Sequence, residues 1–195
     1  MYYDQLMRRA RAARAVKDRQ RDALAVLDAI DITQHIAAVY KPLHDDIEAA
    51  AHTTYTLPGG RGSCKSSFVS LEIVNGIMKD TTGHSNAIVF RLYGNTLRES
   101  VFSQIAWAID TLGVNHLWKS RLSPMQWTYT PTGAQIIFRG LDDPSKLKSI
   151  KPTRGVFRYI WFEEFSELPG PNFTRNVMQS VQRGGDTFTV FRSFN

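Results

Sequence analysis

The stretch that decides the fold reads TTYTLPGGRGSCKSSF and runs from residue 53 to residue 68. Residues 53–57 are mostly β-branched or aromatic and predict a strand, which Pro58-Gly59-Gly60 ends. The apolar residues that follow the glycines recur at helical spacing, and they are Phe68, Leu71, Val74 and Met78. That spacing predicts a helix. A strand, a glycine-rich turn and a helix in succession are typical of parallel α/β folds.

The turn between this strand and helix matches a phosphate-binding loop, G-x-x-x-x-G-K-[ST], at every fixed position but one. Its eight residues are Gly59, Gly60, Arg61, Gly62, Ser63, Cys64, Lys65 and Ser66. In such a loop the glycines let backbone N–H groups surround phosphate oxygens, and the following helix adds the positive end of its dipole. The pattern predicts ATP binding, with Lys65 reaching the β- and γ-phosphates and the Ser66 hydroxyl coordinating Mg²⁺. The alternative is a glycine-rich turn that precedes Lys-Ser by chance.

Cys64 is the departure, because the motif has its second glycine there. A side chain at this position crowds the approach of the backbone to a nucleotide, so we expect reduced nucleotide affinity. A thiol near a helix N-terminus and a lysine is in a setting that makes cysteines reactive. We therefore expect Cys64 to be sensitive to alkylation and to be protected by nucleotide. As the single cysteine of the chain, it excludes an internal disulfide and a zinc site made of cysteines.

A pair of acids follows a second apolar segment. Residues 156–162 predict a buried strand, and Glu163 and Glu164 come directly after it. A phosphate-loop ATPase needs one acid at such a strand end for Mg²⁺ and a neighbouring acid to polarise the attacking water. Because successive side chains of a strand point to opposite faces, we assign Glu163 to the metal and Glu164 to the water. Without the phosphate loop, the pair would indicate an ordinary solvated strand end.

The other segments alternate between strands and helices. Strands are predicted at 87–92, 126–129, 135–139 and 187–194, and helices at 97–112 and 172–181. A capping box, Thr96–Glu99, opens the first of these helices. The alternation predicts a mainly parallel central sheet with helices on both faces. Together with the phosphate loop and the acid pair, it indicates a three-layer P-loop NTPase of the extra-strand, catalytic-glutamate type. The hairpin at 126–139 is then a decoration on the sheet.

The last predicted strand ends in polar residues. Ser193 and Asn195 lie at its tip, where a polar group senses the γ-phosphate in ATPases with an extra strand between the two nucleotide motifs. The alternative is an ordinary serine and asparagine at a strand end. If this strand forms an unprotected edge of the sheet, aggregation becomes a risk.

Composition and charge indicate one domain with a basic appendage. The 195 residues are 43% apolar and 22% charged, which is enough for a buried core. No apolar stretch is long enough to span a membrane, and the first residues lack a signal-peptide layout, so we expect an intracellular protein. The net charge of +6 favours a polyanionic partner. We expect a basic helical segment at 1–39 and the P-loop ATPase domain at 40–195.

The positive charge is concentrated near the N-terminus. Seven basic residues lie between Arg8 and Arg21 against one acid, Asp18, and the alanines among them predict a helix over residues 3–30. This helix is either a solvated linker or a binding site for a phosphate-bearing or protein partner. The candidate DNA contacts are Arg8, Arg9, Arg11, Arg14, Lys148 and Lys151. The five histidines show no metal-ligand spacing.

Taken in order, these segments resemble the ATPase portion of the large subunit of tailed-phage terminases, over residues 40–195. The resemblance rests on residues 59–66, 92–109, 138–143, 161–164 and 193–195. It implies that Lys65 and Ser66 bind nucleotide and metal. It also implies that Glu163 serves the metal, that Glu164 activates water, and that Ser193 and Asn195 couple phosphate loss to movement.

Arg61 matches an arginine that this family carries inside the phosphate loop. There it could act in catalysis by stabilising transition-state charge, or it could point to solvent or DNA. Adenine contacts are not assigned, although Tyr40, Lys41 and Pro42 lie upstream of the first strand, where such contacts are often found.

The resemblance implies Mg²⁺-dependent ATP hydrolysis that drives viral double-stranded DNA into a procapsid. The implied partners are DNA, a portal protein, a small terminase subunit and further copies of the chain in a ring, without a membrane. The implied location is the cytoplasm of the bacterial host, and transiently the procapsid portal. The alternatives are another P-loop ATPase, such as a helicase or RecA-like motor, and a nucleotide-binding fragment without turnover. Because the family continues into a nuclease beyond the position of Asn195, we expect a fragment or shortened relative that lacks nuclease activity.

Overall fold

The computed structural model describes residues 2–142 and 150–195. Its helices are α1 (Tyr2–Leu27), α2 (Lys41–Glu48), α3 (Lys65–Lys79), α4 (Ser103–Thr111) and α5 (Pro171–Val181). Its strands are β1 (Thr54–Pro58), β2 (Ser85–Arg91), β3 (Trp118–Leu122), β4 (Met125–Tyr129), β5 (Ala134–Gly140), β6 (Val156–Glu163) and β7 (Thr189–Phe194). Short helical turns are η1 (Ile32–Gln34), η2 (Ala38–Tyr40), η3 (Gly94–Thr96), η4 (Arg98–Phe102), η5 (Asn115–Leu117) and η7 (Phe165–Glu167).

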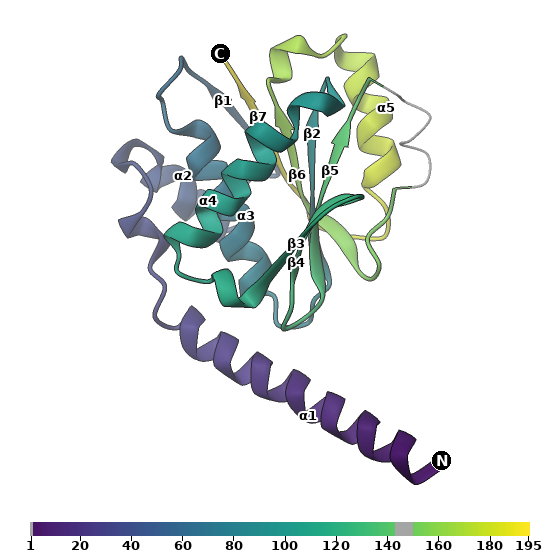
Figure 1. Cartoon of the computed structure of the whole chain (residues 1–195). Helices are drawn as coiled ribbons and strands as arrows, with labels where there is room; N and C mark the ends of the chain where they lie inside the picture. The colour runs from purple at the N-terminus through teal and green to yellow at the C-terminus, as the bar shows by residue number, and fades with distance from the viewer. Residues whose placement is uncertain (1, 143–149) are drawn as a thin grey trace.

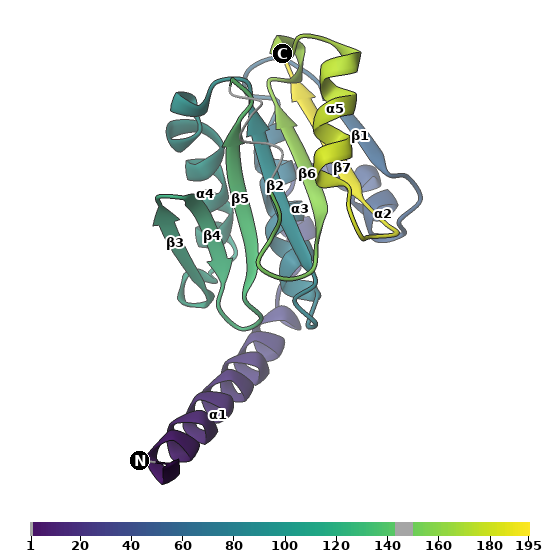
Figure 2. The same ribbon diagram turned by 90° about the vertical axis from the view of Figure 1, so that its right-hand side faces the viewer.

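Within these residues the strands form one seven-stranded sheet in the order β1-β7-β6-β2-β5-β4-β3. The first five strands are parallel, and β4 and β3 are paired antiparallel. Helices α3 and α4 lie on one face of the sheet and α5 lies on the other (Figures 1 and 2). The predicted three-layer, mainly parallel α/β fold is confirmed.

The central strands are buried because helices pack on both faces of the sheet. The middle of β2 is buried throughout. Its Val89 belongs to the core on the α3 side, and its Ile88 belongs to the core on the α5 side. Burying one side chain of this size stabilises the fold by about 1.5–3 kcal/mol. A strand with two buried faces reads as a continuous apolar run, which is why the sequence predicted it.

The helix predicted at 97–112 is present as the π-helical turn η4 followed directly by α4, but Thr96 does not cap it. Thr96 lies inside the turn η3, where its hydroxyl donates to the carbonyl of Tyr93 at 2.8 Å, and the helical turn that follows has no side-chain cap. The π-helical turn η4 follows, and α4 begins only at Ser103. Close backbone packing holds η3 in place, since a Cβ on Gly140 would lie 2.6 Å from the Gly94 Cα. The capping-box prediction is wrong because the hydroxyl serves a local turn.

The predicted hairpin is present as β4 and β5, but it is part of the sheet itself. β5 pairs in parallel with β2, and the antiparallel β4 and β3 then extend the sheet beyond it. The sequence did not predict β3. Its residues after Trp118 are all exposed and show no apolar alternation.

The last strand is interior, so it does not form the unprotected edge that would create an aggregation risk. β7 pairs with β1 on one side and with β6 on the other. Its backbone groups are therefore satisfied on both sides, and the aggregation risk does not arise at this strand. The edges of the sheet are β1 and β3.

Helix α1 projects away from the body of the domain at the end opposite the marked C-terminus (Figures 1 and 2). Only the C-terminal part of the helix reaches the core, where Ala23 is buried. Among the described residues, no helix combines the length and apolar character needed to cross a membrane.

Candidate functional site

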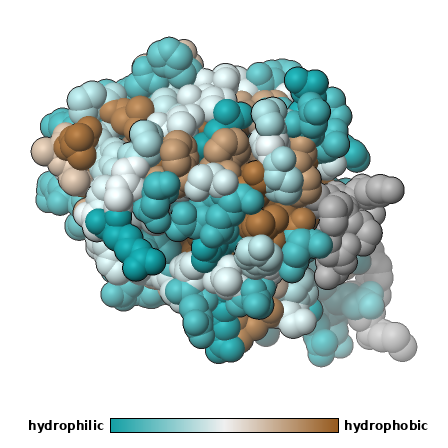
Figure 3. Space-filling model, turned by 90° about the horizontal axis from the view of Figure 1, so that it is seen from above, coloured by the Kyte–Doolittle hydropathy of each residue, from teal (hydrophilic) through white to brown (hydrophobic). Residues whose placement is uncertain are grey.

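The predicted phosphate loop, the acid pair and the last strand meet at one end of the sheet. β1, β7 and β6 are neighbours and parallel, so the residues that follow or end these strands gather at their carboxyl ends. A pocket of about 320 Å³ lies there, and its lining includes Lys65, Glu163, Glu164 and Asn195. Figure 3 looks down on this end of the molecule, where the surface is mostly hydrophilic with hydrophobic areas between.

The phosphate loop requires left-handed backbone at two residues. Gly62 has φ 81°, which glycine adopts without penalty. Cys64, directly before α3, has φ 60° and ψ 16°. A residue with a Cβ pays about 1–2 kcal/mol for this conformation. The structure thus gives a physical reason why the motif has glycine at this position, and the Cys64 side chain is exposed.

Lys65 is buried in the loop, with 7% of its surface exposed. Its ammonium group donates to the carbonyls of Gly59 and Gly60 and, at 3.0 Å, to the Ser63 hydroxyl. It also donates to the Asn195 Oδ1 at 3.1 Å, although 130 positions separate the two residues. The lysine therefore links the phosphate loop to the chain segment after β7.

Glu163 connects the loop helix to β7. One carboxylate oxygen accepts from the Ser66 hydroxyl at 2.9 Å, and the other accepts from the Ser193 hydroxyl. The indole N–H of Trp161 donates to the same Ser193 oxygen at 2.9 Å and fixes its position. Burial raises the pKa of Glu163 and outweighs the two serine hydroxyls, which lower it. Hydroxyl and carboxylate oxygens at this spacing are the donor set that Mg²⁺ prefers.

Glu164 leaves the direction of the strand. Its backbone is left-handed (φ 54°, ψ 52°), so the acid pair is divided by a kink after β6 and not by the simple alternation of a strand. The Asn195 side-chain amide donates to the Glu164 carboxylate at 3.2 Å. Asn195 thus contacts both the lysine of the loop and the predicted catalytic acid.

The remaining predicted residues are not all at this pocket. Arg61 lines it and is exposed. The α1 arginines (Arg8, Arg9, Arg11 and Arg14) are exposed on the projecting helix, away from the pocket (Figure 1). Lys151 is exposed before β6, and Lys148 lies outside the described residues.

Two contributors to the site were not predicted. Trp161 was read only as part of an apolar strand, yet its N–H positions Ser193. Tyr40 donates its hydroxyl to the Ser63 carbonyl at 2.7 Å and stacks on Phe68. The sequence singled out Tyr40 only as one of three residues, with Lys41 and Pro42, that lie where adenine contacts are often found, and not as a support of the loop.

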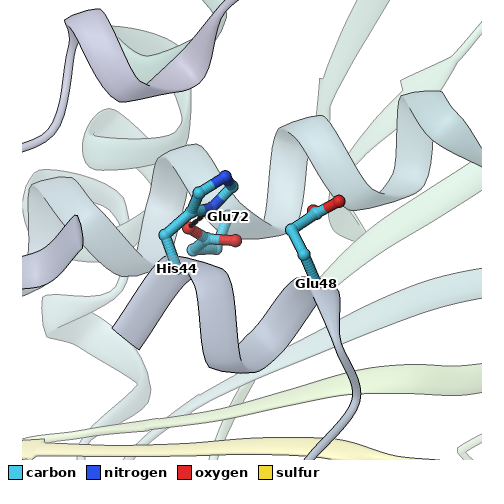
Figure 4. A group of neighbouring side chains, drawn as sticks. All are labelled: His44, Glu48 and Glu72. Atoms are coloured by element: carbon cyan, nitrogen blue, oxygen red, sulfur yellow. Dashed lines mark hydrogen bonds and ion pairs between the residues drawn. The ribbon is translucent and has the colours of Figure 1, made fainter. Parts of the chain in front are cut away.

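A second group of ionisable side chains lies behind the loop helix. One oxygen or nitrogen atom from each of His44, Glu48 and Glu72 lies within 4.8 Å of the other two. Figure 4 shows the three side chains side by side between α2 and α3. His44 Nδ1 is 2.7 Å from the Glu72 carboxylate, and Glu48 forms an ion pair with Lys79 at 2.6 Å. The hydrogen bond with Glu72 raises the pKa of His44, and burial raises the pKa of Glu72. These groups neutralise one another and hold α2 against α3.

The chain is similar in sequence to a known protein family and to known proteins. Residues 51–195 match the protein family described as phage terminase large subunit. The terminase large subunit of Bacillus phage SPP1 is 38% identical over 167 residues, which are 84% of this chain and 38% of that protein. This chain therefore spans less than half of that relative.

The fold is also similar to that of solved phage proteins, including the following two. The N-terminal domain of the DNA packaging ATPase from bacteriophage phi29 has a TM-score of 0.56 at 17% identity, covering 77% of this chain and 76% of that one. The large terminase from a thermophilic bacteriophage, in complex with ADP, has a TM-score of 0.57 at 14% identity, covering 75% of this chain and 34% of that one.

Proposed function

The chain belongs to the phage terminase large subunit family, and from that membership we propose that it hydrolyses ATP with Mg²⁺ to drive double-stranded viral DNA into a procapsid. One observation carries the proposal. Around one pocket, Asn195 is hydrogen-bonded to both Lys65 and Glu164. At the same pocket, Ser66 is hydrogen-bonded to Glu163. The ADP bound to the large terminase of the thermophilic bacteriophage supports a nucleotide as the ligand of this fold.

The phosphates of ATP would lie at the N-terminus of α3. Free backbone N–H groups and the helix dipole favour an anion there. Lys65 would exchange its carbonyl partners in the loop for oxygens of the β- and γ-phosphates. Arg61, exposed at the rim of the same pocket, is proposed to approach the γ-phosphate and stabilise transition-state charge.

Ser66 and Glu163 fit a magnesium ion, because their oxygens are hard donors 2.9 Å apart at the pocket. When bound, Mg²⁺ supplies positive charge that neutralises the phosphates. The raised pKa of Glu163 reflects a buried carboxylate, whose charged form a nearby cation would favour.

Glu164 is proposed as the base that orients and deprotonates the attacking water. Asn195 donates to this carboxylate and accepts from Lys65. When Lys65 moves to a phosphate, the Asn195 Oδ1 would lose its donor, and a rotation of the Asn195 amide away from Glu164 would then leave that carboxylate free to turn toward the water. Ser193, fixed between Trp161 and Glu163, would transmit the same change along β7.

The DNA and protein partners are also proposals. Among the described residues, the ion pairs of α1 are made by Arg21. Arg8, Arg9, Arg11 and Arg14 are exposed and are proposed to contact DNA phosphates, as is Lys151. We propose the portal protein, a small terminase subunit and a ring of identical chains as partners, with the work done in the bacterial cytoplasm and on the portal. Within the chain, residues 40–195 are proposed as the ATPase domain and 1–39 as its helical extension. No nuclease role is proposed for these residues.

Turnover of Glu164→Gln tests the catalytic assignment. We expect ATP binding to be retained and hydrolysis to fall by at least about 100-fold, the lower range for a general base. Glu167→Gln is the matched control, because Glu167 lies on the same turn, is exposed and does not line the pocket. Hydrolysis by Glu164→Gln at the wild-type rate would place the base elsewhere. Stimulation of wild-type turnover by double-stranded DNA separates a packaging motor from other P-loop enzymes.

A further inference from the structure

A tyrosine outside the nucleotide pocket contacts the phosphate loop. Tyr40 ends η2, and its hydroxyl donates to the Ser63 carbonyl at 2.7 Å. Its ring stacks on Phe68 of α3, with centroids 4.7 Å apart and planes inclined by 11°. Burial raises the pKa of Tyr40, so the hydroxyl remains a donor well above neutral pH. Tyr40 is thus braced by the helix that follows the loop and holds one carbonyl of the loop itself.

The carbonyl that Tyr40 holds belongs to the peptide bond directly before Cys64. Cys64 is left-handed, with φ 60°, a conformation that a Cβ disfavours. The simplest relaxation rotates the Ser63–Cys64 peptide plane. That rotation separates type II from type I turns and takes the next φ from positive to negative. It would also turn the Ser63 carbonyl away from Tyr40, so the hydrogen bond opposes the relaxation.

The same hydrogen bond sets the direction of a phosphate donor. In a trans peptide the N–H points opposite to the C=O. Tyr40 does not line the pocket, whereas Ser63 and Cys64 do. A Ser63 carbonyl held toward Tyr40 therefore directs the Cys64 N–H to the other side, where the loop faces the pocket. Rotation of the peptide would replace this donor with a carbonyl oxygen, which repels phosphate.

We propose that Tyr40 is a positioning residue that keeps the phosphate loop in its nucleotide-binding conformation, and that the chain depends on it because Cys64 stands where glycine would relieve the strain. The inference rests on the proposed function for its ligand, a nucleoside diphosphate or triphosphate. A net hydrogen bond shifts an equilibrium by about two- to tenfold, and a left-handed penalty shifts it by about five- to thirtyfold. Because the two effects are similar in size, removing the hydroxyl is enough to change the population of the competent loop.

The experiment compares ADP binding, by calorimetry with Mg²⁺, in two backgrounds. Tyr40→Phe keeps the ring stack and removes the hydroxyl, and we expect about three- to tenfold weaker binding, since the apparent affinity falls with the fraction of competent loop. In the Cys64→Gly background the same substitution should weaken binding by less than about twofold, because glycine adopts positive φ freely. Tyr55→Phe is the matched control. Its hydroxyl donates to the Asp46 carboxylate and the His52 carbonyl, away from the pocket, so binding should not change.

The outcomes separate this role from a merely structural one. Equal affinities of wild type and Tyr40→Phe overturn the inference, and so does the same loss in both backgrounds, because a general packing defect would not depend on Cys64. If the wild-type chain binds no ADP, the proposed function fails, and the crystal structure of Tyr40→Phe then decides the inference. A negative φ at Cys64 in that variant supports it, and an unchanged positive φ overturns it.

Discussion

Replacing His44 with alanine should destabilise the domain, and the loss should grow with pH. The Glu72 side chain is 2% exposed, and its carboxylate is 2.7 Å from His44 Nδ1. Without His44 the buried carboxylate has no partner, a change that typically costs about 3–5 kcal/mol. In the variant, protonating Glu72 costs less free energy than burying its unpaired charge. At pH 7 that protonation costs about 3 kcal/mol for a carboxyl whose ordinary pKa is 4.5, at about 1.4 kcal/mol per pH unit.

The sign of the pH dependence follows from burial. Burial already raises the pKa of Glu72 in the folded protein, and removing His44 removes the partner that lowers it. A carboxyl whose pKa is higher in the folded state than in the unfolded state destabilises the fold at pH values above its unfolded-state pKa. This loss of stability increases with pH until the folded-state pKa is reached. In the wild type, the His44 pKa is raised, chiefly by the bond with Glu72, so the charged pair persists toward neutral pH. The free-energy difference between variant and wild type should therefore increase from about 1 kcal/mol at pH 5 to about 3 kcal/mol at pH 7.

Urea unfolding followed by circular dichroism at pH 5, 6, 7 and 8 measures this difference. His52→Ala is the matched control, because the His52 side chain pairs with Asp46 at the surface and is 72% exposed, and its effect should be small at every pH. In the double variant His44→Ala with Glu72→Gln, the pH-dependent penalty of protonating Glu72 should disappear, because position 72 no longer titrates. A loss of stability that is the same at pH 5 and pH 8 would refute the reasoning.

Three further results are expected. Mg-ATP should slow alkylation of Cys64, which lines the pocket; equal labelling rates with and without nucleotide would contradict the assignment. Burial raises the pKa of Asp80, but hydrogen bonds from Thr82 and Ser85 outweigh it and bring the pKa down to about 2. The loss of stability in Asp80→Ala should therefore be about 1 kcal/mol larger at pH 7 than at pH 2, after a discount for solvent screening, as unfolding at the two values will show. Changing the α1 arginines to glutamine should reduce the slope of log K against log salt for double-stranded DNA by up to about 0.9 per lost phosphate contact; an unchanged slope removes α1 from the DNA interface.

The chemistry of the site could be predicted because each motif is local. A strand, glycines and Lys65-Ser66 must be contiguous for a loop to wrap phosphates onto a helix N-terminus. Glu163 and Glu164 likewise follow directly on a strand whose buried apolar run is visible in any window of the sequence. The three-layer fold followed from the same alternation of elements. The capping box at Thr96 shows the limit of such reasoning, since the same hydroxyl satisfies a turn equally well.

Tertiary structure alone decided how these motifs are joined. Strand order depends on long-range pairing, and it placed β7 between β1 and β6, which brought Asn195 to Glu164 across 31 positions and to Lys65 across 130. Serine and asparagine are common at strand ends, so no local pattern distinguishes the ones that meet the carboxylate proposed to be catalytic. The left-handed backbone of Cys64 and its support by Tyr40 depend on the orientation of one peptide plane. That orientation is set by the packing of distant segments and not by the residues of the loop.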